Sequence, residues 1–254
     1  MEFTIDKNVL KNHLILASRF SSSKLSSTPI LQGALIIADK NTITIKTTNL
    51  NDYFSTILKC VVIKPGKAII DLKSLIEYLG LSDDQEITLK SDQNNINITK
   101  NKTKINFPIY QSEDFPQLDI KKGKTIDLTN KELDQINSIL FSTSKDSSRP
   151  TLTGIHFCFK NNQNYIITTD GFRLSIIKSN TKNNYPTITI SPSLFQETIS
   201  GLTYSETDNA VTTNINQTTI TSRIIAGDYP PFEKVIPSET KTTIIINRQD
   251  FSIG

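Results

Sequence analysis

Most of the chain alternates apolar and polar residues with a period of two. The alternation is clear in residues 42–46 (TITIK), 87–90 (ITLK), 96–99 (INIT) and 187–190 (TITI). This period is typical of antiparallel strands that bury one face and expose the other to water. The pattern therefore predicts a protein built mainly of antiparallel sheets.

Helical spacing of apolar residues appears in only four segments, two in each half of the chain. These segments are residues 7–19, 72–79, 130–141 and 192–200. Thr129 and Glu132 form a capping-box pair at the start of the third segment, and Gly80 follows the second. Ser191 and Gly201 bound the fourth segment with a typical N-cap and C-terminal glycine. We expect two helices and about eight strands in each half.

The chain contains an internal repeat with a period of about 120 residues. The matched segments keep their order: residues 27–33 (STPILQG) with 148–154 (SRPTLTG), 47–49 (TTN) with 168–170 (TTD), and 113–116 (EDFP) with 227–230 (GDYP). A period of this length is too long for a solenoid unit and suits a whole small domain. The repeat therefore predicts a tandem duplication of one domain.

A third copy of the pattern begins near the end of the sequence. Each copy opens with an apolar strand that leads into a polar cap and a helix, at residues 3–10, 126–133 and 244–251. We expect one domain at 1–121, a second at 122–240, and the first strand and helix start of an incomplete third at 241–254. On this interpretation the 254 residues are part of a chain about three times 120 residues long.

Composition places the chain among ordinary globular proteins. Hydrophobic residues make up 36% of it and charged residues 21%, which is enough apolar material for two cores. No apolar run approaches the roughly 20 residues of a membrane span and no signal peptide precedes the first strand, so we expect a cytoplasmic protein with no membrane contact. Cys60 and Cys158 are isolated and fit free thiols in a reducing compartment. The net charge of +3 permits contact with a polyanion without demanding it.

The sequence lacks the usual traces of catalysis. It contains no GxxxxGK[ST], GxGxxG or GxSxG motif, and only two histidines. His156 lies near Cys158, but no second Cys or His pair completes a metal site. Asp170 and Gly171 fit a turn better than a catalytic acid. We therefore expect no enzyme activity, no metal and no cofactor.

Several of these segments together resemble the bacterial sliding clamp family, the beta subunits of DNA polymerase III. The resemblance to the family's second domain lies in residues 148–155 (SRPTLTGI), 169–175 (TDGFRLS) and 227–230 (GDYP). The resemblance to its first domain lies in residues 3–5 (FTI), 29–31 (PIL) and 113–116 (EDFP). It implies an α+β fold of tandem clamp domains, each with two helices backed by antiparallel β-sheets.

The resemblance also implies a function without catalysis. Subunits of this family form a homodimeric ring around double-stranded DNA and act as a processivity factor, tethering the replicative polymerase for DNA replication. The implied partners are DNA of any sequence and, through short peptide motifs, the DNA polymerase III alpha subunit, the clamp loader and repair proteins. We expect a homodimer at full length and a monomer for residues 1–254 alone, because a head-to-tail interface needs both of its faces.

Three sets of residues carry over from the family by position. The DNA-binding set is Lys24, Lys73, Lys145, Ser147, Ser148 and Arg149. The partner-peptide pocket is Leu152, Thr169, Gly171, Phe172, Arg173, Leu174, Pro230 and Val235. The dimer edge is Ile76, Tyr78, Lys102 and Lys104. Phe172 departs from the histidine that is common at its place in the family.

Simpler interpretations remain open for these residues. The lysines fit solvated surface positions, and Leu152, Leu174 and Val235 fit a core. For the whole chain the alternatives are a tandem β-rich binding module that does not encircle DNA, and an enzyme at the cleft between the domains.

Overall fold

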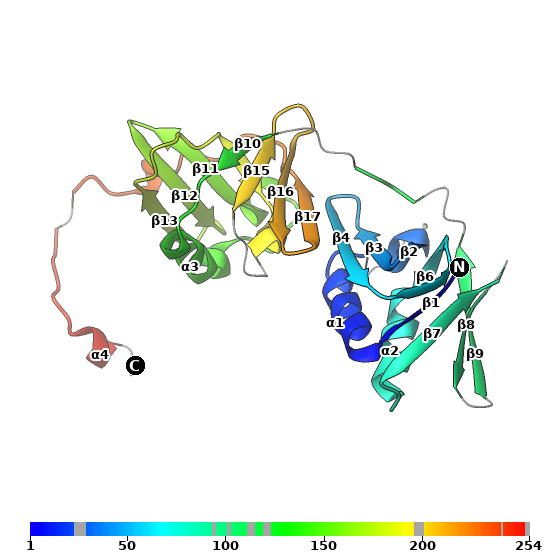
Figure 1. The fold of residues 1–254 in the computed structure, drawn as a ribbon. Helices are drawn as coiled ribbons and strands as arrows, with labels where there is room; N and C mark the ends of the chain where they lie inside the picture. Colours follow the sequence, from blue (N-terminus) through cyan, green and yellow to red (C-terminus); the bar gives the residue numbers. More distant parts are fainter. Residues whose placement is uncertain are drawn as a thin grey trace.

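A computed structural model describes residues 1–22, 29–92, 95–100, 103–110, 115–118, 123–195, 201–239 and 241–251. Figure 1 shows two lobes side by side, with a C-terminal segment that runs away from both. The first lobe holds β1 to β9 with helices α1 and α2, and the second holds β10 to β17 with helix α3. None of the helices within these ranges is long and apolar enough to cross a membrane.

The first lobe contains nine strands and two helices among the described residues. Its strands are β1 (Glu2–Asp6), β2 (Gly33–Asp39), β3 (Thr42–Thr48), β4 (Asp52–Lys59), β5 (Val61–Lys64), β6 (Gly66–Asp71), β7 (Glu86–Ser91), β8 (Asn95–Lys100) and β9 (Thr103–Tyr110). Its helices are α1 (Lys7–Ser18), α2 (Leu72–Leu81) and the 3-10 turn η1 (Pro29–Gln32). Alternating burial along β3 and β4 confirms the period-two prediction for this half.

The second lobe contains eight strands among the described residues. They are β10 (Lys124–Ile126), β11 (Ile155–Lys160), β12 (Gln163–Thr169), β13 (Leu174–Ser179), β14 (Ile188–Ile190), β15 (Leu202–Ser205), β16 (Ala210–Ile215) and β17 (Thr218–Arg223). The helical elements are α3 (Asn130–Ile139) and the 3-10 turns η2 (Leu140–Ser142), η3 (Pro150–Thr153), η4 (Pro192–Phe195) and η5 (Phe232–Val235). A last short helix, α4 (Arg248–Phe251), lies in the C-terminal segment.

The strands form two sheets. Thirteen strands follow the order β10-β15-β16-β17-β4-β3-β2-β6-β9-β8-β7-β1-β5, and four follow the order β13-β12-β11-β14. The antiparallel pair β17 and β4 joins the lobes, with Thr218 opposite Thr56 and Ser222 opposite Asp52. The Thr56 and Thr218 hydroxyls share a buried hydrogen bond of 2.8 Å. The two halves of the chain are thus joined by a strand ladder as well as by the connecting segment.

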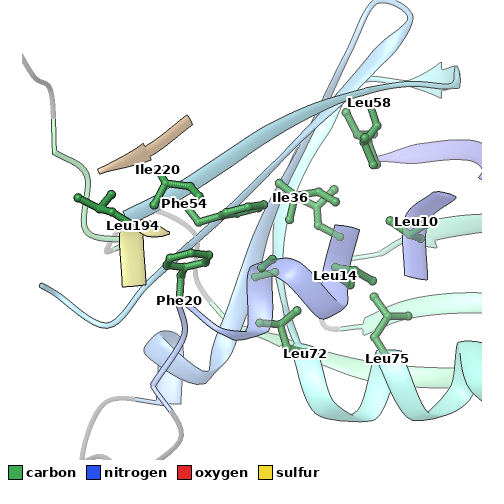
Figure 2. Packing of buried hydrophobic residues seen from close by; sticks show 14 of the residues in the cluster. Leu10, Leu14, Phe20, Ile36, Phe54, Leu58, Leu72, Leu75, Leu194 and Ile220 are labelled. Carbon is green, nitrogen blue, oxygen red and sulfur yellow. The ribbon is translucent and has the colours of Figure 1, made fainter. Parts of the chain in front are cut away.

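One hydrophobic core extends through both lobes beneath this ladder. Figure 2 shows Phe20 and Phe54 from the first lobe beside Leu194 and Ile220 from the second. The rings of Phe20 and Phe54 stack with centroids 5.5 Å apart, and all four side chains are buried. Burial of these apolar groups stabilises the junction in addition to the backbone hydrogen bonds.

Three of the four predicted helices are present with nearly the expected bounds. The Asp6 carboxylate caps α1 by accepting from the Val9 N–H at 2.8 Å, and the predicted capping box begins α3. Helix α2 passes through Gly80 and ends one residue later; the Ser82 N–H donates to the Tyr78 carbonyl at 3.0 Å. Gly80 therefore does not end this helix as predicted.

Two expected elements differ from the sequence pattern. The helix predicted at 192–200 begins as the short 3-10 turn η4, and residues 196–200 lie outside the described part of the chain. Residues 244–246 were expected to form a strand but have no strand partner among the described residues, and Ile245 is 96% exposed. An apolar strand needs a neighbour to satisfy its backbone groups, so the apolar run that opens each copy does not by itself form a strand here.

The junction core yields a stability prediction. Phe54→Ala should lower the free energy of unfolding by about 3 kcal/mol or more, because it removes a buried ring and leaves a cavity. Phe251→Ala removes an exposed ring and should change it by less than about 0.5 kcal/mol. Urea denaturation followed by circular dichroism measures both, and equal effects for the two variants would contradict the assigned core.

Candidate functional site

A cavity of about 400 Å³ opens on the second lobe. It lies between the 3-10 turn η3, the turn that follows β12, and the segment that leads into η5. The lining residues are Arg149, Leu152, Thr169, Gly171, Phe172, Arg173, Leu174, Tyr229, Pro230, Pro231, Phe232 and Val235. The eight residues of the predicted partner pocket thus all surround one cavity.

The turn between β12 and β13 forms one wall and is fixed by its own hydrogen bonds. The Asp170 carboxylate accepts from the backbone N–H groups of Phe172 and Arg173, each at 2.9 Å. The Thr169 hydroxyl donates to the Arg173 carbonyl at 2.7 Å and accepts from the Gly171 N–H at 3.1 Å. Gly171 has a φ of 92°, a conformation that favours glycine. Asp170 therefore holds a turn, as the sequence indicated.

This wall carries an ion pair between Arg173 and Asp170 at the rim of the cavity. The Arg173 guanidinium donates from Nε to Asp170 Oδ2 at 2.9 Å and lies over the Phe141 ring at 5.4 Å. The backbone N–H bonds from Arg173 and Phe172, followed by the Arg173 side chain, lower the pKa of Asp170 to about 2. The pair is therefore ionised at neutral pH. Phe172 next to it is 99% exposed, so the rim carries an unburied aromatic ring.

The opposite wall is the segment from Tyr229 to Val235, which packs against the four-stranded sheet. The Tyr229 ring stacks on the His156 imidazole with centroids 4.1 Å apart and planes 7° apart. Phe232 packs on Tyr165 at 5.6 Å between centroids, and Glu233 forms an ion pair with Lys160. Val235 at the end of the wall is 68% exposed and presents an apolar side chain to the cavity mouth.

Ionisable groups behind the pocket are held in their neutral forms. Burial lowers the pKa of His156 to about 4 and raises the pKa of Tyr229. Burial, with the nearby Glu233 charge, raises the pKa of Cys158 to about 11. The Cys158 thiol is therefore protonated at neutral pH and is a poor nucleophile. No group of three potential metal ligands occurs in the described ranges. This chemistry fits a docking pocket.

The predicted DNA-binding residues fall into separate places. Lys145, Ser147, Ser148 and Arg149 share the exposed loop between η2 and η3. Within this loop the Ser148 hydroxyl donates to Asp146 Oδ2 at 2.7 Å, and this bond lowers the pKa of Asp146. The Arg149 side chain lines the pocket. Lys73 is exposed on α2 in the first lobe, and Lys24 lies outside the described residues.

The described residues of the predicted dimer edge belong to α2 and to β9, and α2 contacts β9 through Tyr78 and Phe107. The Tyr78 ring meets the Phe107 ring edge-on with centroids 6.0 Å apart, and Ile76 is half-buried on the same helix. Lys104 belongs to β9, and Lys102 lies outside the described residues. In the described structure β9 pairs with β8 along its length and with β6 only near Tyr110, so most of β9 has one open edge.

Four lining residues were not in the predicted pocket. Arg149 was assigned to DNA, while Tyr229, Pro231 and Phe232 were not assigned at all. Three of them were within reach of sequence reasoning, because Tyr229 belongs to the repeated GDYP segment and Pro231 and Phe232 follow it directly. The contact between His156 and Tyr229 could not be predicted, because 73 positions separate two residues that no motif links.

Comparison with known proteins gives a consistent result. The family model for the N-terminal domain of the DNA polymerase III beta subunit matches residues 1–119, and that for its central domain matches residues 127–231. The beta sliding clamp of Streptococcus pneumoniae strain R6 is 26% identical over 269 residues, covering 97% of this chain and 70% of that protein.

Solved structures show the same fold. A DnaN sliding clamp from Bartonella birtlesii bound to griselimycin superposes with a TM-score of 0.88 at 24% identity, covering all of this chain and 72% of the other. The Helicobacter pylori beta clamp bound to a DNA ligase peptide gives a TM-score of 0.83 at 18% identity, covering 100% and 74%. The fold is therefore that of a DNA sliding clamp, which confirms the α+β expectation. The chain belongs to the DNA polymerase III beta subunit family.

The buried histidine behind the pocket yields a pH prediction. The folded pKa of His156 is about 4, below the roughly 6.5 of an unfolded histidine, so only the unfolded chain gains a proton as pH falls between these values. The free energy of unfolding should therefore fall by about 2 kcal/mol from pH 7 to pH 5. Urea titrations at each pH measure it.

Two variants separate this effect from other titrations. His156→Phe should remove most of the pH dependence, because it removes the group that takes up the proton. His13→Gln removes the other histidine and should leave the dependence in place. A His156→Phe variant that keeps the full wild-type slope would show that another group is responsible.

Proposed function

We propose that this protein acts as a sliding clamp, a ring that encircles duplex DNA and tethers the replicative polymerase. The observation that carries the proposal is the pocket: eight residues selected from the family resemblance surround a single cavity in the second lobe. Membership of the beta subunit family supports it. On this proposal the protein is not an enzyme, and its work is done by holding DNA and partners together in the bacterial cytoplasm.

The pocket has the chemistry of a peptide-docking site. Apolar side chains such as Leu152 and Val235 suit the hydrophobic anchors of a short segment, and the Arg173 cation at the rim can donate to its backbone or acidic groups. The preformed turn at Asp170 reduces the entropy lost on binding. We propose that the DNA polymerase III alpha subunit, the clamp loader and repair proteins dock here through short motifs.

Contacts with DNA on this proposal are weak and independent of sequence. Lys73, Lys145 and Arg149 supply separate positive charges, and the carboxylate of Asp146 lies within the second-lobe loop. A ring that slides holds DNA by topology, and each further ion pair with phosphate adds affinity and salt dependence. We propose that two full-length subunits close the ring head to tail, with α2 and the open edge of β9 on one side of the contact.

Peptide docking can be tested with two matched valines. Val235→Asp places a charge at the mouth of the apolar pocket and should weaken binding of a fluorescent peptide from a replicative polymerase about tenfold or more. Val61→Asp alters a valine of similar exposure on β5, 65% against 68%, and should leave affinity unchanged. Fluorescence anisotropy gives both dissociation constants, and equal affinities for the two variants would reject the pocket.

Topological holding requires a test of its own. The gene product at its full natural length is loaded by a clamp loader onto nicked circular DNA and washed in high salt, before and after the circle is cut. Retention on the circle with rapid loss from the linear form is expected, because salt weakens phosphate contacts and does not open a closed ring. Equal loss from both forms would favour the open binding module.

A further inference from the structure

We propose that His156 is a positioning residue for the pocket: its imidazole ring holds Tyr229 and thereby sets the place of the wall from Tyr229 to Val235. His156 does not itself line the cavity. The expected effect on peptide affinity rests on the proposed docking of partner peptides. The expected effect on the position of the wall can be measured without a peptide.

The wall depends on side-chain contacts because its backbone is poorly tied to the sheets. Among the described residues after β17, one backbone bond reaches the four-stranded sheet, from the Ile225 N–H to the Thr189 carbonyl at 2.8 Å. Pro230 and Pro231 have no N–H to donate. Among the described residues, the backbone bonds formed by 228–236 stay within the turn η5. The strand ladder therefore does not place the wall.

Side-chain contacts place the wall instead, and Tyr229 and Phe232 belong to a hydrophobic cluster that also contains Cys158 and Ile167. The stack of Tyr229 on His156 lies at its start, and the Phe232 contact with Tyr165 and the Glu233 pair with Lys160 lie further along. Pro230 and Pro231 lie between the first contact and the others, and both line the cavity. The stack thus decides how far the start of the wall lies from β11, which carries His156.

The imidazole is itself fixed. His156 is 7% exposed on β11, and its Nδ1 is 3.0 Å from the Thr189 hydroxyl on the neighbouring strand β14. These two residues are also paired across the ladder of β11 and β14. A ring held from two sides is a rigid surface for another ring, and stacked aromatic pairs contribute beyond the area they bury. The low pKa of His156 keeps this ring neutral at physiological pH.

The aromatic ring of Tyr229, and not its hydroxyl group, makes the contact with His156. Its hydroxyl is buried and has no hydrogen-bond partner among the described residues. A buried hydroxyl without a partner costs stability, so it does not anchor the wall. Tyr229→Phe should therefore keep the stack and the pocket, with equal or higher stability.

The test compares variants at His156 with a variant of similar thermal stability elsewhere in the lobe. His156→Leu removes the flat ring and should weaken binding of the polymerase peptide about three- to tenfold, the worth of an aromatic pair. His156→Phe restores a flat ring and should restore the affinity to within about twofold. Val211→Ala truncates a buried residue on β16 in the other sheet, so it should lower stability without changing affinity.

A second measurement needs no peptide. Hydrogen exchange at the Lys234 and Ile236 amides, which bond within η5, should become faster in His156→Leu than in Val211→Ala at equal loss of stability. Unchanged exchange at these amides in His156→Leu would overturn the positioning role. If they are protected in the wild type and exposed in His156→Leu, yet no variant binds the peptide, the positioning role stands and the proposed function fails.

Equal outcomes across the variants are also decisive. If His156→Leu and Val211→Ala weaken peptide binding alike, His156 contributes only to general stability and the inference is wrong. If His156→Phe fails to restore an affinity lost in His156→Leu, the hydrogen bond to Thr189 matters and the ring stack does not.

Discussion

The pairing of β17 with β4 is the interaction on which the rest of the structure depends. It runs from Thr218 opposite Thr56 to Ser222 opposite Asp52, and the Phe20 and Phe54 rings pack beneath it beside Leu194 and Ile220. Backbone hydrogen bonds fix how the two strands align at the junction, and the buried rings stabilise it. Two lobes joined in this way share one thirteen-stranded sheet, so the relative positions of Lys73 and the loop at Lys145 are set by the fold.

The pocket lies beside the four-stranded sheet, outside the thirteen-stranded sheet that joins the lobes. Its turn wall belongs to the four-stranded sheet and is fixed by the Asp170 hydrogen bonds, while its other wall comes from a segment without strands. Contacts of side chains such as Tyr229 and Phe232 therefore hold this wall in place, as the ladder of β17 and β4 holds the two lobes together at the junction. A wall held in this way can also move more easily than a strand, because fewer backbone hydrogen bonds must break when it does.

Local sequence patterns predicted the individual helices and strands well, but they did not predict which elements pair or pack with each other. Period two identified strands such as β3 and β4, and helical spacing with caps identified α1 and α3, because each signal reports on the residues that form the element. The strand expected at 244–246 is not present, because the apolar run that indicated it does not supply the partner that a strand needs. The pairing of β17 with β4 was also out of reach, since about 160 positions separate its residues. The eight pocket residues came from family resemblance, and the supporting role of His156 came only from the structure.

The ionisable groups around the pocket suit the docking role proposed for it. Burial keeps three ionisable groups near the pocket in their neutral forms: the His156 ring is neutral, and the Cys158 thiol and the Tyr229 hydroxyl keep their protons. The charges of Asp170 and Arg173 are paired with each other at the rim. A site arranged this way offers an apolar interior and a fixed polar edge, which suit the proposed docking of a short peptide. His156 and Cys158, which the sequence did not complete into a metal site, are buried beside the pocket wall, where His156 stacks on Tyr229.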